Sequence, residues 1–77
     1  MYGRPTPLQL QERRRVGDRI RYLRRQRGLS QEKLAELIGR DRQSVSSWER
    51  GATPLNLDDL AAIAQVCGVA TWRLFYG

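Results

Sequence analysis

Histidine is absent from this sequence of 77 residues, and cysteine occurs only once. A single cysteine cannot form a disulfide within the chain, and without histidine the usual Cys/His ligand set of a zinc site cannot be assembled. A glycine-rich phosphate-binding motif and a carboxylate cluster typical of a metal site are also missing. We therefore expect a protein that is not an enzyme and that uses neither a metal nor another cofactor.

Long apolar runs are lacking as well. No segment approaches the length of apolar residues that a membrane-spanning helix requires, and the N-terminus has no apolar stretch of the signal-peptide type. One unpaired thiol fits a reducing compartment. The length suits a single domain. These observations predict one cytoplasmic domain without a membrane segment.

Positive charge is concentrated at one end of the chain, whose formal net charge is +6. Residues 1–29 contain nine Arg against two acidic residues, residues 30–51 are balanced at four against four, and residues 52–77 carry one Arg against two Asp. Such an excess favours an acidic partner, either a nucleic acid or an anionic membrane. Thirteen of the 14 basic residues are Arg, whose planar guanidinium matches pairs of phosphate oxygens.

The spacing of apolar residues predicts an all-α domain over residues 11–77, behind a flexible N-terminal arm of residues 1–10. Val16, Ile20 and Leu23 recur at the spacing of one helix face. Pro5 and Pro7 disfavour a helix in the N-terminal arm that precedes this face. Ser30, Asp41 and Asn56 are suitable N-caps for later helices. Five helices are expected, over about residues 11–27, 31–38, 42–50, 57–67 and 71–75.

The second and third of these helices form a helix-turn-helix over about residues 30–50, because only Gly39, Arg40 and Asp41 separate them. Val45 and Trp48 are the only apolar residues of the third helix, so its remaining face is polar. Such a face can be an ordinary solvated surface. It also suits base reading in the major groove, since Gln can pair with adenine, Arg with guanine and Ser with several partners.

A series of short segments resembles the phage repressor and Cro family of helix-turn-helix regulators. The matching segments are Gly28-Leu29-Ser30-Gln31-Glu32-Lys33-Leu34-Ala35, Ile38-Gly39, Val45 and Trp48-Glu49-Arg50-Gly51. The resemblance extends over about residues 16–75 and implies a compact, five-helix, lambda-repressor-like DNA-binding domain.

The resemblance also implies roles for individual residues. Arg24 and Glu49 are expected to form a partly buried ion pair that is structural. Cys67 is expected to be a small buried hydrophobe. The residues implied to read base edges are Arg42, Gln43, Ser46 and Ser47. Those implied to contact phosphates are Gln31, Arg40, Ser44, Arg50 and, from a following loop that lacks basic residues, Thr53.

We therefore expect a sequence-specific regulator that binds duplex DNA, acts as a repressor, and forms a homodimer on a near-palindromic operator. Trp72, Phe75 and Tyr76 either form the self-association surface or cap the core, with Leu55 and Leu57 nearby. Two alternatives stay open: an antitoxin with a toxin partner, and a controller protein of a restriction-modification system. Membrane binding through the first helix is disfavoured, because the core requires the apolar residues of that helix.

Overall fold

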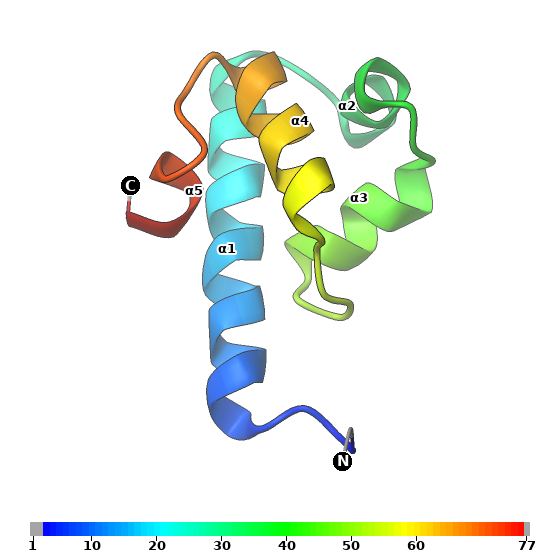
Figure 1. Ribbon diagram of the computed structural model, residues 1–77. Helices are drawn as coiled ribbons and strands as arrows, with labels where there is room; N and C mark the ends of the chain where they lie inside the picture. Colours follow the sequence, from blue (N-terminus) through cyan, green and yellow to red (C-terminus); the bar gives the residue numbers. More distant parts are fainter. Residues whose placement is uncertain (1–2, 77) are drawn as a thin grey trace.

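The computed structural model describes residues 3–76. Five α-helices make up this part of the chain, with the longest helix at its centre (Figure 1). The helices α2 and α3 lie on one side of α1, the short α5 lies on the other, and α4 packs between them. The predicted all-α, five-helix architecture is confirmed. The helices are α1 (Pro7–Gln26), α2 (Gln31–Ile38), α3 (Arg42–Glu49), α4 (Leu57–Cys67) and α5 (Arg73–Tyr76).

Helix α1 begins at Pro7, four residues earlier than predicted. The Thr6 hydroxyl accepts a hydrogen bond from the Gln9 backbone N–H at 3.1 Å, and the Gln9 side-chain oxygen accepts one from the Thr6 N–H at 2.8 Å. Proline in the first turn suits this start because its N–H would be unpaired there anyway. Residues 7–10, which were predicted to lie in the flexible arm, therefore belong to helix α1. Residues 1–2 of that arm lie outside the described residues.

The N-caps predicted for the next three helices are confirmed. The side chains of Ser30, Asp41 and Asn56 accept hydrogen bonds from backbone N–H groups three residues further on, at 3.0, 2.8 and 2.8 Å. Each cap satisfies one donor that the first helical turn cannot pair internally. Helix α5 differs slightly from its prediction, because a turn at residues 71–72 precedes it and it extends to Tyr76.

The core receives apolar side chains from every helix, including those predicted for α1. Ile38 is partly buried at the edge of the core. Cys67 is buried, and burial raises the pKa of its thiol, as expected for a small hydrophobe. The buried apolar residues are Val16, Ile20, Leu23, Leu34, Ala35, Val45, Trp48, Leu60, Ile63, Ala64, Cys67 and Leu74.

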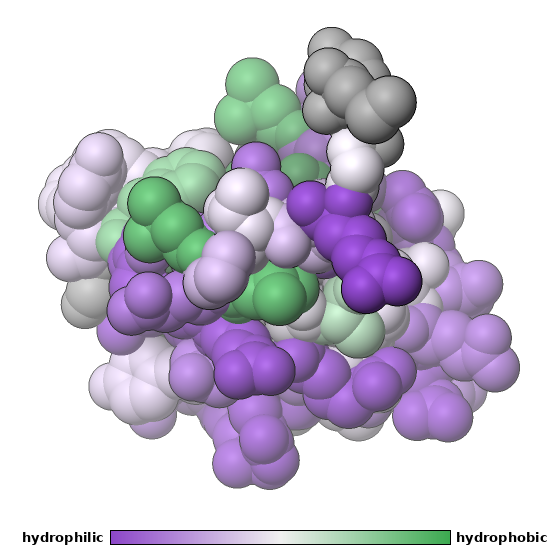
Figure 2. Space-filling view, turned by 90° about the horizontal axis from the view of Figure 1, so that it is seen from below, coloured by the Kyte–Doolittle hydropathy of each residue, from purple (hydrophilic) through white to green (hydrophobic). Residues whose placement is uncertain are grey.

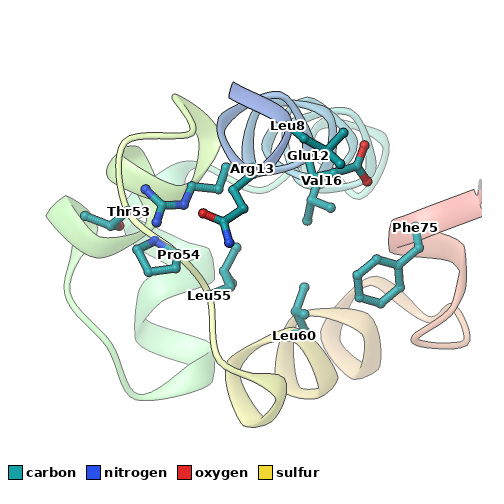
Figure 3. A pocket seen from close by; sticks show the side chains of 10 residues that line it. Leu8, Glu12, Arg13, Val16, Thr53, Pro54, Leu55, Leu60 and Phe75 are labelled. Carbon is teal, nitrogen blue, oxygen red and sulfur yellow. The ribbon is translucent and has the colours of Figure 1, made fainter. Parts of the chain in front are cut away.

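The early start of α1 adds a wall to an apolar groove at one end of the molecule. Figure 3 shows Leu8 and Val16 of α1 facing Leu55, Leu60 and Phe75 across this groove. The same end is seen from below in Figure 2, where hydrophobic patches lie among hydrophilic side chains. Leu55 and Phe75 pack against the core here, so both help to cap it.

Helices α1 and α3 approach each other so closely at Gly17 that no side chain fits at this position. A Cβ atom at Gly17 would overlap the Trp48 carbonyl oxygen and lie 2.8 Å from that of Glu49. Gly51, which follows α3, has a φ of 71°, and its Cβ would lie 2.7 Å from Cγ of Arg14. The C-terminal end of α3 therefore rests directly on the backbone of α1, and this contact sets the orientation of α3.

We predict that Gly17→Ala lowers the free energy of unfolding, by ~1–3 kcal/mol as for other overpacked sites. The direction is informative, because Gly→Ala inside a helix ordinarily stabilises by roughly 0.5–1 kcal/mol. Urea unfolding monitored by Trp fluorescence measures the change. Gly3→Ala is the control, since no atom lies within 4 Å of the added Cβ. A Gly17→Ala variant as stable as the unmodified chain would contradict the close contact.

Candidate nucleic-acid interface

The turn between α2 and α3 is built from residues that end one helix and start the next. Helix α2 ends at Gly39, whose φ of 73° is left-handed, and Asp41 caps α3. Hydrogen bonds from Ser44 lower the pKa of the Asp41 carboxyl, and the bond from the Ser44 side chain has a larger effect than the bond from its backbone N–H. The stabilisation from this cap is therefore present above the ordinary pKa of an Asp and is lost as the pH falls through the lowered value.

Helix α3 turns one face to the core and the opposite face to solvent. Val45 and Trp48 are buried, as predicted, and anchor the inner face. Arg42 and Gln43 are exposed, whereas Ser46 is half-buried. The outer face forms a shallow concave surface that brings together all four residues predicted to read bases, together with one predicted phosphate contact. We call this surface the α3 outer face; it is lined by Arg42, Gln43, Ser46, Ser47 and Arg50.

The loop after α3 is held beside this face. The hydroxyl oxygens of Ser47 and Thr53 lie 2.9 Å apart and share a hydrogen bond. Thr53, predicted to contact phosphate, is exposed next to a residue predicted to read bases. Ser44 is half-buried in the first turn of α3, beside the outer face and outside the concave surface.

The predicted pair of Arg24 and Glu49 is present and buried. Its two hydrogen bonds measure 2.6 and 3.0 Å, and the side chains are 8% and 3% exposed. Arg24 also donates to the Leu29 carbonyl at 2.7 Å. The Gln31 side-chain amide donates to Glu49 at 3.1 Å. One cluster thus joins α1, the start of α2 and the end of α3, and Gln31 has a structural partner that sequence reasoning missed.

Arg40 is the predicted phosphate contact whose surroundings differ most from expectation. Its guanidinium donates to Asp59 of α4 at 2.8 Å and lies 5.1 Å from the ring centroid of Trp48. A second, longer hydrogen bond of 3.5 Å joins it to Ser44. Arg40 is therefore bound to its own protein in this structure, and a phosphate would compete with Asp59 for it. Exposed pairs of this kind are weak.

The comparisons with known proteins agree with this architecture. Residues 20–71 match the family model HTH_3, described as Helix-turn-helix. The match covers more than half of the chain, which therefore belongs to this helix-turn-helix family. The family that the resemblance predicted is confirmed.

Two curated relatives are named as transcriptional regulators. One, from Sinorhizobium medicae, is an uncharacterized HTH-type transcriptional regulator, 35% identical over 66 residues that cover 86% of this chain and 45% of the relative. The other is YonR, an uncharacterized SPbeta prophage-derived HTH-type transcriptional regulator from Bacillus subtilis. It is 31% identical over 61 residues, covering 79% of this chain and 56% of YonR. The chain thus spans about half the length of these relatives.

Solved structures show the same fold. The restriction-modification controller protein C.AhdI from Aeromonas hydrophila superposes with a TM-score of 0.82 and 36% identity, over 86% of this chain and 96% of C.AhdI. The hypothetical transcription factor NHTF from Neisseria gives a TM-score of 0.79 and 31% identity, over 96% of this chain and 85% of NHTF. Within residues 3–76, none of the helices combines the length and apolarity needed to cross a membrane.

We predict that Glu49→Ala lowers the free energy of unfolding by ~3–5 kcal/mol, because it leaves the buried guanidinium of Arg24 without its counterion. Urea unfolding at low temperature measures the loss. The matched control is the double variant Arg24→Met/Glu49→Leu. Replacing both partners with apolar residues is often neutral, so this variant should recover most of the lost stability. Equal losses in the single and double variants would show that the charge pair is not the cause.

Proposed function

We propose that this protein is a non-enzymatic transcriptional regulator that binds duplex DNA sequence-specifically, with α3 in the major groove. The observation that carries this proposal is the α3 outer face, where hydrogen-bonding side chains gather on a helix anchored by Val45 and Trp48. The major groove, about 12 Å wide, admits a helix whose diameter with side chains is about 10–12 Å. The names of the curated relatives support the same function.

The proposed roles divide the interface into base reading and positioning. Base contacts specify sequence, whereas phosphate contacts fix register and orientation. Arg40 is a positioning residue, which contacts a phosphate after releasing Asp59. Gln31 is another, and it contacts a phosphate through the side-chain N–H that is not bonded to Glu49. The proposed base-reading residues are Arg42, Gln43, Ser46 and Ser47, and the other phosphate contacts are Ser44, Arg50 and Thr53.

We also propose a homodimer on a near-palindromic operator. Of the side chains predicted for the self-association surface, Leu57, Trp72 and Tyr76 are well exposed, at 70%, 57% and 82%. Such residues are candidates for a self-association surface. A two-fold dimer places its α3 helices one DNA turn apart, ~34 Å. Bound at a promoter, such a dimer represses by blocking access.

The likeness to C.AhdI supports a second candidate, a controller protein of a restriction-modification system, because it extends over 96% of that chain. A controller activates as well as represses. Transcription in vitro from the bound promoter separates the two candidates: a repressor only lowers the transcript, whereas a controller raises it at some protein concentrations. Restriction and methyltransferase genes beside the coding gene would favour the controller.

We predict that selection from random duplexes, at a stated salt concentration, enriches two related half-sites in inverted orientation. Their centres should lie one helical turn apart, about 10 base pairs, if two α3 helices bind the same face of the duplex. Enrichment of a single half-site would contradict the dimer while preserving sequence-specific binding. No enrichment over the starting pool would contradict the proposed function itself.

We predict that Arg42→Ala and Gln43→Ala each reduce discrimination between the selected site and a mismatched one. Each bidentate base contact contributes about 1–3 kcal/mol, or roughly 5- to 150-fold. Competition binding against both duplexes measures the ratio. Arg27→Gln is the control for charge, because it removes a positive charge at the C-cap of α1, beside Gly68 and away from the α3 outer face, and its discrimination should not change. Unaltered discrimination in both α3 variants would contradict the base-reading assignment.

A further inference from the structure

Apart from the buried Arg24 and the groove-lining Arg13, the five other arginines of α1 fall into two sets with different surroundings. Arg15 pairs with Glu12 at 2.8 Å and donates to the Phe75 carbonyl, and the Glu12 hydrogen bond raises the pKa of its guanidinium. Arg19 donates to the Arg73 carbonyl at 3.2 Å. Both therefore hold α5 against α1, which gives them a structural role.

The second set has no such partners. Arg14, Arg21 and Arg25 are exposed, and none of them makes a side-chain hydrogen bond or ion pair within residues 3–76. Residues separated by seven and by four positions lie on the same side of a helix. These three residues are called the α1 arginine stripe.

The stripe lies in solvent on α1, and two of its residues adjoin the contact with α3. Arg14 precedes Gly17 by three positions and Arg21 follows it by four, so both flank the point where α3 rests on α1. Arg14 also lies so close to Gly51 that a Cβ atom added there would be 2.7 Å from its Cγ. Gly51 follows Arg50, which lines the α3 outer face. The stripe therefore continues the basic surface from the end of α3 onto α1.

Asp18 is the one acidic residue that the sequence places among these arginines. It lines a shallow hollow together with Arg21 and Arg25. One carboxylate against three guanidinium groups leaves the stripe with an excess of positive charge. An anionic ligand is the partner that this excess favours.

We propose that Arg14 and Arg21 bind phosphates of the DNA backbone beyond the segment that α3 reads, with Arg25 extending the contact. This inference rests on the proposed function, because α3 in the major groove brings the α1 side of the crossing close to the adjoining backbone. At ~1.5 Å of rise per residue, Arg14 and Arg21 lie about 10 Å apart along α1. The two residues can therefore contact separate phosphates. Such contacts add affinity and fix orientation without specifying sequence.

The test is the salt dependence of binding to the selected duplex. Each phosphate contact contributes about 0.9 to the slope of log K against log salt concentration. Arg14→Gln and Arg21→Gln should each reduce the slope by about 0.9, and the double variant by about 1.8, with unchanged preference between sites. Arg27→Gln removes the same charge at the C-cap of α1, where the guanidinium lies beside Gly68 and outside both the stripe and the proposed self-association surface, and should leave the slope unchanged.

A variant with the opposite effect guards against simple misfolding. Asp18→Asn removes the one acid beside the stripe, so it should tighten binding to all duplexes, matched or mismatched, to a similar extent. The same loss of slope in Arg27→Gln as in the two stripe variants would overturn the inference. Unchanged slopes in the stripe variants, with sequence-specific binding by the unmodified chain, would overturn it while sparing the proposed function.

An anionic membrane is the other surface that a basic stripe can bind. Vesicles of phosphatidylserine and phosphatidylcholine provide the comparison at the same salt concentrations. We expect the duplex to displace the unmodified chain from them. Vesicle binding that persists against excess duplex and disappears in Arg14→Gln/Arg21→Gln, with an unchanged DNA slope, would overturn the inference. Absence of any duplex binding by the unmodified chain would instead overturn the proposed function.

Discussion

The direct contact between the end of α3 and the backbone of α1 is the constraint on which the rest of this structure depends. Gly17 allows the contact, and the buried pair of Arg24 and Glu49 secures it about two helical turns further along α1. Leaving a buried charge without its partner is costly, so this pair resists any change in the angle between the helices. The position of the α3 outer face follows from these residues, although none of them belongs to it.

The same crossing also explains how the many arginines of α1 can serve different purposes. On the side of α1 that faces α5, Arg15 and Arg19 donate hydrogen bonds to the backbone carbonyls of Phe75 and Arg73. Arg14, Arg21 and Arg25 remain in solvent, and the first two flank the contact with α3. Net charge alone does not distinguish these sets. The side of the helix on which each residue lies does.

Much of the fold follows from local sequence. Side-chain caps such as Asp41, the helix-ending Gly39 and the spacing of apolar residues specify where helices begin and end, since each acts within one turn of the chain. The start of α1 was missed because Pro7 was read as a helix breaker, whereas Thr6 and Gln9 form a reciprocal cap around it. The Thr-x-x-Gln spacing carried that signal.

The candidate site was predicted less completely, because several of its features depend on contacts between distant segments. The pairing of Arg24 and Glu49 came from the family resemblance, not from spacing. Neither the bond from Arg40 to Asp59 nor the donation from Gln31 to Glu49 has a local signature. These partners are 19 and 18 positions apart in the chain, and only the packing of whole helices brings them together.

The two faces of α3 are encoded by different residues, and this separation has an evolutionary consequence. Val45 and Trp48 maintain the core, while Arg42, Gln43 and Ser46 point away from it and make no side-chain hydrogen bond to the described chain. Surface substitutions of this kind usually change stability by less than about 0.5 kcal/mol. Under the proposed base-reading role of these three positions, a lineage of such proteins can acquire new operators by drift there, while the scaffold beneath them stays intact.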